Sequence, residues 1–534
     1  MLLNRIFQYL SYLTIGIIFV YITPLLFSVP SWEIKEVFPL VILDSDYSDS
    51  LLRTLSFSIL STLGIIAVSF FLGYILKNIK HKKLLLWGSL LLLPFLLGSV
   101  STSFLFKVLF LHSNILNLAF NNALILFFIL GVIQFWQFGT LFTYIFWLNN
   151  LSIRETLKEY TDFYNFTSWE KIKHIFLPHQ RNLVILLSIF CFVSNLYEVT
   201  KLQIIFRASK GTNSELISTT LYNAYLSNSR ISPDFAINTL FSQVTIFYLP
   251  LFLISTLLLY IFISRAISFI IRPNTYFSFV NIRNTVKNRI SVCSLIFLII
   301  TILLPILIII IKQGLQVHNL SYLAKTVYLS LLASLILIIV FILPLSYYLR
   351  VKHKHKFYEI NDSSLWIFIL FFLLFLIPPL ALMLFGFEWN NILGVKGAFS
   401  TNVIWVLGQC INSLPIIGSF IFVVHFIVRN KELYYLETMN ANFLEIVHWS
   451  FLKRFRLEYF MTFLFSFSII WNEGTFNKIY SDVIPSYVSE ILRTVNSRNA
   501  DYSQGMMFFL FSLFLGVICI ILWNIILQRF FRPK

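Results

Sequence analysis

The chain alternates between long runs of apolar residues and short polar segments, and this pattern predicts its secondary structure. A helix needs about 20 mostly apolar residues to cross a bilayer, whereas a barrel strand needs far fewer. The sequence therefore predicts an all-α membrane protein with about twelve transmembrane helices. The twelve apolar stretches lie near residues 8–28, 51–76, 84–110, 123–148, 182–206, 235–263, 290–312, 324–349, 364–386, 400–428, 457–480 and 504–528.

Composition agrees with lipid as the solvent. Hydrophobic residues make up 58% of the chain and charged residues only 12%, which is too few for a water-exposed surface. The first stretch follows Met1–Arg5 and has no small-residue cleavage site after it. We therefore expect an uncleaved first helix rather than a removed signal peptide.

The net charge of +17 sets an orientation rather than indicating a nucleic-acid partner. With the N-terminus inside, 27 of the 40 Lys and Arg residues fall in cytoplasmic segments, as the positive-inside rule requires. Clusters at Lys77–Lys83 and Lys352–Lys356 dominate this bias, although the second could also be a lipid-headgroup or metal site because it contains His353 and His355. We expect a multi-pass protein of the bacterial cytoplasmic membrane, with both termini cytoplasmic.

Six predicted helices precede a basic connector at residues 271–289 and six follow it. An even number in each half gives both halves the same orientation, so we predict two parallel six-helix repeats, residues 1–270 and 290–534. Three residue pairs recur at a nearly constant offset: Thr54 and Thr326, which are 272 residues apart, and Glu198 and Glu473, and Glu215 and Glu490, each 275 apart.

Glu198 and Glu473 are acidic residues within apolar stretches. An ionised side chain there costs about 2.5–3.5 kcal/mol or more unless it meets water or a partner. One hypothesis is that both carboxylates line a translocation pathway at the repeat interface and attract a cationic substrate. The other is that each lies at the headgroup boundary, where it caps a helix end or pairs with Lys201 and Lys478.

The polar segment between the fourth and fifth predicted helices has the most specific pattern. It begins with an acid, carries an apolar face and reaches a proline at its twentieth position. It resembles the coupling loop of the permeases of binding-protein-dependent ABC importers. Six residues carry this resemblance: Glu159, Asn165 in place of a turn glycine, Trp169, Ile175, Leu177 and Pro178. Tyr160 and Thr161 replace the two alanines that are typical of that family.

The resemblance extends more weakly over the rest of the chain. Glu437 begins an equivalent loop after the tenth predicted helix, but this loop ends near Phe455 without glycine or the closing Leu-Pro. Prolines interrupt the third helix at Pro94 and the ninth at Pro378. An ordinary amphipathic interfacial helix is the alternative for the loop at 159–178.

The resemblance implies a type I ABC importer permease, fused in the manner of ferric iron and thiamine permeases. It implies two copies of a cytoplasmic ABC ATPase docked on the loops, a periplasmic or surface binding protein, and a lipid environment. The chain has no phosphate-binding Gly-x-x-x-x-Gly-Lys-Ser/Thr motif, so ATP and Mg²⁺ would bind the partner ATPase. We expect no cofactor, metal or catalytic residue on this chain. Ferric iron is the favoured cargo and thiamine the next.

Two other classes remain open from the sequence. A secondary transporter of the major facilitator type also has six plus six helices, but it usually carries a Gly- and Asp-containing motif after the second helix. Here that connection reads Lys77-Asn78-Ile79-Lys80-His81-Lys82-Lys83. An integral membrane polymerase or transferase would need an outer loop rich in acid and base groups, and the longest outer segments contain no such cluster.

Overall fold

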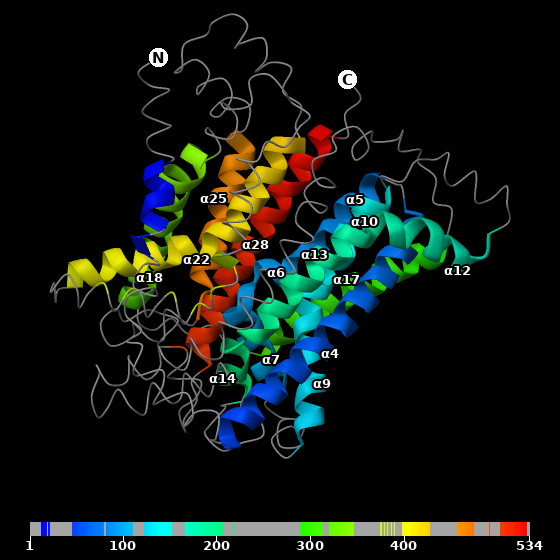
Figure 1. Cartoon of the computed structure of the whole chain (residues 1–534), viewed down its shortest axis with the longest axis horizontal. Helices are drawn as coiled ribbons and strands as arrows, with labels where there is room; N and C mark the ends of the chain where they lie inside the picture. Colours follow the sequence, from blue (N-terminus) through cyan, green and yellow to red (C-terminus); the bar gives the residue numbers. More distant parts are fainter. Residues whose placement is uncertain are drawn as a thin grey trace, which may run out of the picture. The chain divides into compact units, whose positions relative to one another are not determined.

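The structure is a computed structural model of the chain, and its helices form two compact units (Figure 1). Unit 1 comprises Met1–Leu43, Ala224–Ile263 and Asn319–Glu490, and unit 2 comprises Asp44–Asn223, Ser264–His318 and Ile491–Lys534. The residues described are 12–18, 20–21, 45–79, 82–110, 122–151, 166–206, 216, 289–312, 320–345, 374–375, 377, 379, 382, 386, 389, 398–427, 456–474, 491 and 502–530.

The described part of the chain is helical throughout and contains no strand. In unit 2 the α-helices are α4 (Ser45–Leu76), α5 (Lys82–Gly88), α6 (Leu93–Leu96), α7 (Gly98–Phe110), α9 (Ala123–Gln134), α10 (Thr140–Leu151), α12 (Ser168–Lys171), α13 (Leu177–Leu196), α14 (Thr200–Phe206), α17 (Arg289–Lys312) and α28 (Ser503–Phe530). Unit 2 also has the 3₁₀ turn η1 (Ser89–Leu92) and the π-helical segments η2 (Phe135–Gly139) and η3 (Ile172–Phe176).

Unit 1 is built from fewer described elements. They are α18 (Leu320–Ile336), the π-helical segment η4 (Leu337–Ile342), α22 (Ala398–Ile427) and α25 (Arg456–Trp471). These helices pack pairwise on one another. Helical residues 12–18 and 20–21 belong to the same unit, and Thr14 Oγ1 donates a hydrogen bond to the Val340 carbonyl of η4 at 2.8 Å.

Five described helices are long and apolar enough to cross a membrane: Asp49–Leu76, Leu124–Leu151, Arg289–Ile311, Ser321–Leu345 and Gly505–Gln528. They coincide with the second, fourth, seventh, eighth and twelfth predicted helices. Two bent helix pairs qualify if each is one span, Lys83–Leu96 with Gly98–Phe110 and Ser168–Arg181 with Leu183–Leu196. The protein is thus an all-helical membrane protein with five to seven candidate spans among the described residues, and the total of twelve stays a prediction.

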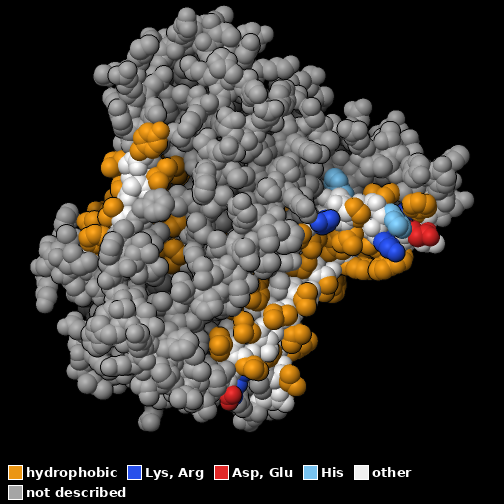
Figure 2. All heavy atoms as spheres, viewed as in Figure 1, with side chains coloured by type: hydrophobic (Ala, Val, Ile, Leu, Met, Phe, Trp, Pro, Cys, Tyr) orange, Lys and Arg blue, Asp and Glu red, His pale blue; other side chains and the backbone are white. Residues whose placement is uncertain are grey.

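The outward faces of these helices are apolar, as lipid contact requires. Figure 2 shows an apolar band along unit 2 with charged side chains at its two ends. Helix α17 is the clearest case, because one of its faces exposes large hydrophobic side chains at helical spacing. They are Ile290, Phe297, Ile300, Leu304, Leu307 and Ile311.

The core of unit 2 lies where α4, α10 and α13 meet. Helix α4 packs on both of the others, and aromatic residues fill the contact, with Phe70 and Phe146 in edge-to-face geometry at 5.7 Å. Gly73 lets α4 approach α10 closely, because a Cβ atom there would lie 2.6 Å from Phe146 Cβ. Asn150 Nδ2 donates to the Gly73 carbonyl at 3.2 Å, which satisfies a polar group at this contact.

The third predicted helix is broken, as its proline suggested, but the bend lies four residues beyond Pro94. The two arms meet at 87° at Gly98, whose φ of 69° is left-handed. Pro94 instead occupies the first turn of α6, where its missing N–H costs little. The bend therefore depends on a glycine that tolerates positive φ rather than on the proline.

Candidate functional site

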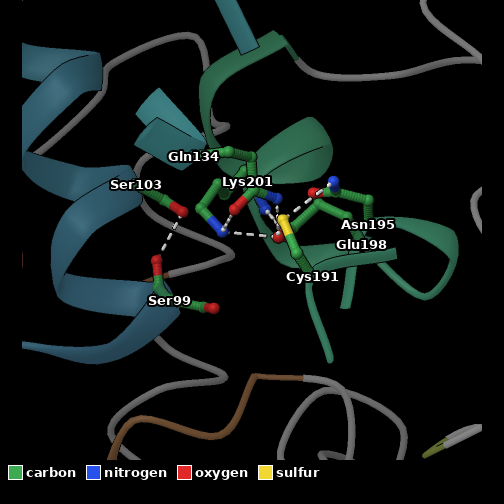
Figure 3. A network of polar contacts seen from close by, with 7 residues as sticks. All are labelled: Ser99, Ser103, Gln134, Cys191, Asn195, Glu198 and Lys201. Atoms are coloured by element: carbon green, nitrogen blue, oxygen red, sulfur yellow. Dashed lines mark hydrogen bonds and ion pairs between the residues drawn. The ribbon is translucent and has the colours of Figure 1, made fainter. Parts of the chain in front are cut away.

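A cluster of buried polar side chains lies inside unit 2, centred on Gln134, Glu198 and Lys201 (Figure 3). The Lys201 ammonium donates to Glu198 Oε2 at 2.5 Å and to Gln134 Oε1 at 3.2 Å. Gln134 Nε2 donates to Glu198 Oε2 at 2.9 Å, so each of the three side chains contacts the other two. We call these residues the polar triad.

Burial makes the triad unusual. Lys201 and Gln134 are 0% exposed and Glu198 is 6% exposed. Burying either charge without its partner would cost several kcal/mol. A close opposite charge and further hydrogen bonds are needed to offset this cost. Because the carboxylate only accepts hydrogen bonds and the ammonium only donates them, the amide orientation of Gln134 is fixed: nitrogen toward Glu198, oxygen toward Lys201.

The elements that carry the triad are held in an irregular junction. Gln134 is the last residue of α9, next to the π-helical segment η2, and π-helical segments often occur at functional sites. Glu198 lies between α13 and α14, where its Oε1 accepts from the backbone N–H of Lys201 at 2.9 Å. The carboxylate therefore also caps the N-terminal turn of α14.

A second buried lysine fixes the other end of α14. The Lys107 ammonium of α7 is 4% exposed and donates to the Ile205 carbonyl at 2.8 Å. A cation at the C-terminal end of a helix is favourable because of the helix dipole. A lysine contact therefore lies at each end of α14: Lys201 with Glu198 at the start and Lys107 with the Ile205 carbonyl at the end.

The polar region continues toward the middle of α4. Asn195 Nδ2 donates to Thr62 Oγ1 at 3.3 Å and to Cys191 Sγ at 3.6 Å. Asn195 Oδ1 and the Ser58 hydroxyl are buried and have no hydrogen-bond partner among the described residues. Such atoms in a protein interior are commonly satisfied by ordered water or a ligand.

Unit 1 contains a matching pair. Gln409 Nε2 lies 3.4 Å from Glu473 Oε2, at the long end of hydrogen-bond range, and the two residues are 64 positions apart, as Gln134 and Glu198 are. Gln409 is 0% exposed, and its Oε1 has no hydrogen-bond partner among the described residues. Glu473 is half-buried directly after α25, a place similar to that of Glu198 after α13.

These contacts bear on the two hypotheses for the glutamates. Glu198 pairs with Lys201, which is the contact that the second hypothesis named. Lys478 lies outside the described residues, and the pathway hypothesis stays a prediction for both glutamates. The two glutamines were missed by the sequence interpretation. The signal was present, however, because Gln134 and Gln409 are 275 residues apart, the same offset as the glutamates.

The second candidate site is the loop that resembles a coupling loop, of which residues from 166 onward are described. Thr167 and Glu170 form a capping box: Thr167 Oγ1 accepts from the Glu170 N–H at 3.3 Å, and Glu170 Oε2 accepts from the Thr167 N–H at 2.7 Å. These hydrogen bonds hold the pKa of the Glu170 carboxyl below its ordinary value of 4.5. Trp169 on α12 is 67% exposed.

This segment is fastened to the basic end of α4. Tyr74 and Phe176 pack edge to face with ring centroids 4.9 Å apart, and the Lys77 ammonium lies 3.4 Å from the Tyr74 ring centroid and 4.1 Å from that of Phe176. Ile175 packs against the core of unit 2. The segment therefore lies at the end of unit 2 that bears Lys77, the first residue of the lysine cluster.

The remaining residues of the loop divide between described and undescribed parts of the chain. Leu177 is 45% exposed, and Pro178 lies in the first turn of α13. The expected surface helix does not stop at Pro178, because the chain passes through the π-helical segment η3 into α13. A π-helical segment accommodates the proline, which has no N–H for the regular ladder. Glu159, Asn165 and Glu437 lie outside the described residues.

No group of three or more His, Cys, Asp or Glu side chains that could hold a metal ion occurs among the described residues. The cysteines are free thiols: Cys191, Cys410 and Cys519 are buried, and Cys293 is exposed. Function is therefore inferred from the two sites and the chain's topology. No family model, no curated protein and no solved structure matches this chain.

Proposed function

We propose that the protein is the permease of an ATP-driven importer and that the segment from Thr167 to Pro178 is a docking surface for a cytoplasmic ATPase. The observation that carries this proposal is the exposed Trp169 on a capped segment fastened to Lys77. Lysine-rich ends of spans face the cytoplasm. An exposed tryptophan on a rigid cytoplasmic segment is suited to protein contact, because rigid aromatic anchors contribute most to binding.

Internal duplication supports the two-half, twelve-span arrangement that such a permease would have. In unit 2, α4, α10 and α13 pack together, and in unit 1, α18, α22 and α25 do the same. A Gln–Glu pair with a spacing of 64 residues occurs in each unit: Gln134 of α9 with Glu198, and Gln409 of α22 with Glu473. Under this proposal, each trio derives from one half of the repeat.

The proposal includes the partners and mechanism that the sequence resemblance implies. A binding protein would deliver a small solute to the outer face, and two ATPase copies would drive the halves between outward and inward states. ATP hydrolysis would belong to the ATPase, since this chain has no phosphate-binding loop. The buried Glu198 and the half-buried Glu473 favour a cationic cargo, with ferric iron and thiamine as the initial candidates.

The test is ATP hydrolysis by the complex purified from native membranes and reconstituted in lipid vesicles. We expect ATPase activity to copurify with the wild-type chain and uptake to require ATP. The Trp169→Ala variant should lose most of the copurifying ATPase. Trp87→Ala is the matched control, because Trp87 of α5 is similarly exposed, at 60%, but lies outside the loop.

The same preparation separates the proposal from a secondary transporter of the major facilitator type. Uptake that proceeds without ATP and collapses with the proton gradient would overturn the importer proposal. Loss of ATPase from both tryptophan variants alike would remove the loop as the docking surface. ATP-dependent uptake that is present in the wild type and in Trp87→Ala but lost in Trp169→Ala would support the loop as the docking surface.

A further inference from the structure

One end of unit 2 gathers basic side chains from several helices. Helix α4 ends there, next to the start of α17, because Ser291 Oγ donates to the Ile75 carbonyl at 2.7 Å. The rings of Tyr74 and Phe176 bring the start of α13 to the same place. We call this end the basic rim. The cations whose side chains are described there are Lys77, Lys83, Lys171, Lys173, Arg181 and Arg289.

Negative charge is scarce at the basic rim. Glu170 is the only acid there among the described residues, and its carboxylate is already held by the capping box at Thr167. Asp46 and Asp49 belong to the first turns of α4, and a helix of 32 residues is about 48 Å long, so they lie more than a bilayer core away. Glu198 follows the far end of α13. The described acids of unit 2 therefore cannot neutralise the rim.

Half of the rim cations are open to a partner outside the docking segment. Lys77 lies over two aromatic rings, and Lys171 and Lys173 belong to the segment assigned to the ATPase. The other three are exposed, lie outside that segment and make no ion pair with a described residue. They are Lys83, Arg181 and Arg289. These three charges can meet an anion that the protein itself does not supply.

The three cations lie at the ends of candidate membrane-crossing helices. Lys83 and Arg289 are each the first residue of a candidate span or span arm. Arg181 lies just before Leu183, where the second arm of the bent pair in α13 begins. Ile290, next to Arg289, is 67% exposed, so the lipid-facing side of α17 begins beside this charge. Each cation is therefore placed at the boundary between the apolar core of the bilayer and its headgroup layer.

We propose that Lys83, Arg181 and Arg289 bind the phosphate groups of anionic phospholipids in the cytoplasmic leaflet. Lysine-rich ends of spans face the cytoplasm, and the negative charge of that leaflet attracts Lys and Arg. A guanidinium group can bind two phosphate oxygens at once, and the lysine adds a third charge. Headgroups already occupy the boundary at which these cations lie, so lipid fits the position better than a soluble acidic protein. The inference does not depend on the importer proposal.

The test uses the full chain in nanodiscs that contain equal amounts of phosphatidylglycerol and phosphatidylcholine. Native mass spectrometry of the released protein counts the lipids that stay bound, and we expect the wild type to retain phosphatidylglycerol about fivefold over phosphatidylcholine. The triple variant Lys83→Gln, Arg181→Gln, Arg289→Gln should retain both lipids about equally. The charge-conserving variant Lys83→Arg, Arg181→Lys, Arg289→Lys should keep the preference. Arg53→Gln is the control at the other end of α4, where Arg53 pairs with Asp49 at 4.0 Å, and it should keep the preference too.

Thermal unfolding separates lipid from other anions. In phosphatidylcholine discs the wild type and the triple glutamine variant should unfold at the same midpoint, and phosphatidylglycerol should raise the midpoint of the wild type only. An undiminished phosphatidylglycerol preference in the folded triple variant would overturn the proposal. So would equal stabilisation of the wild type by inorganic phosphate in detergent, which would indicate a site for free phosphate, or by polyglutamate in phosphatidylcholine discs, which would indicate an acidic protein partner. Because neither assay uses ATP, failure of the importer proposal leaves both results interpretable.

Discussion

The indole N–H of Trp523 donates a hydrogen bond to the hydroxyl of Tyr144 at 3.0 Å, across 379 residues of sequence. Tyr144 belongs to α10 and Trp523 to α28, which is the last described helix. Ser101 and Ser512 make a second buried hydrogen bond between α7 and α28 at 2.9 Å. The C-terminal helix is therefore integrated into unit 2, together with helices from the first half of the sequence.

This bond gives the first prediction. Tyr144→Phe removes the acceptor and leaves the Trp523 N–H without it, and we expect a loss of about 1–2 kcal/mol in the free energy of unfolding. Trp523→Phe removes the donor as well as packing volume. In the double variant neither partner of the bond remains, so its destabilisation should be smaller than the sum of the two single effects. The midpoint of denaturant unfolding in detergent measures all three, and strict additivity would contradict a direct interaction.

Among the described residues the sequence predicted the helices well, because lipid imposes one pattern on every span, a continuous apolar run. It predicted less about how helices group. No local pattern shows that α28 packs on α6 and α7, since the contact depends on shape and on single hydroxyl and indole groups. Likewise the charges of Glu198 and Lys201 are visible in the sequence, but the amide of Gln134 that joins them lies 64 residues before Glu198.

The second prediction concerns the bend at Gly98. Its φ of 69° is unfavourable for residues with a Cβ atom, so Gly98→Ala should destabilise the fold by about 1–2 kcal/mol. Pro94→Ala should have a smaller effect, since Pro94 lies in the first turn of α6 and does not define the bend. Thermal unfolding of the two variants in detergent distinguishes the cases. A larger loss for Pro94→Ala would assign the bend to the proline after all.

The third prediction compares two glycines on one helix. A Cβ atom at Gly73 would lie 2.6 Å from Phe146 Cβ and 3.1 Å from the Trp147 backbone nitrogen, so Gly73→Ala must push α4 away from α10. We expect a loss of about 1–3 kcal/mol, as for other overpacked cores. Gly64→Ala is the control, because nothing lies within 4 Å of its Cβ position.

For Gly64→Ala we expect a gain of up to about 1 kcal/mol, because alanine is the better helix former. Unfolding midpoints of the two variants should therefore shift in opposite directions. Equal shifts would mean that α4 and α10 are not in close contact at Gly73.

The fourth prediction tests whether Glu198 serves the fold or the cargo. Lys201→Met and Glu198→Gln should each destabilise the protein by about 3–5 kcal/mol, because each leaves one buried charge unpaired. The double variant has no charge to bury, and its stability should approach that of the wild type. If Glu198 only positions α14, uptake should also recover in the double variant. Uptake that stays abolished in a stable double variant would place Glu198 in the translocation pathway.

The fifth prediction addresses the order of the loop and needs no partner protein. Thr167→Ala removes the side-chain acceptor for the Glu170 N–H, a change that costs helices about 1 kcal/mol at their N-terminal cap. Fraying of that size raises the open population about fivefold, so trypsin should cleave after Lys171 about five times faster. Thr167→Ser and Glu170→Gln both retain a capping-box pairing, and cleavage of either should stay near the wild-type rate. Equal cleavage of Thr167→Ala and Thr167→Ser would show that the capping box does not hold this segment, and the rigid presentation of Trp169 would then have to depend on Tyr74, Lys77 and Phe176 alone.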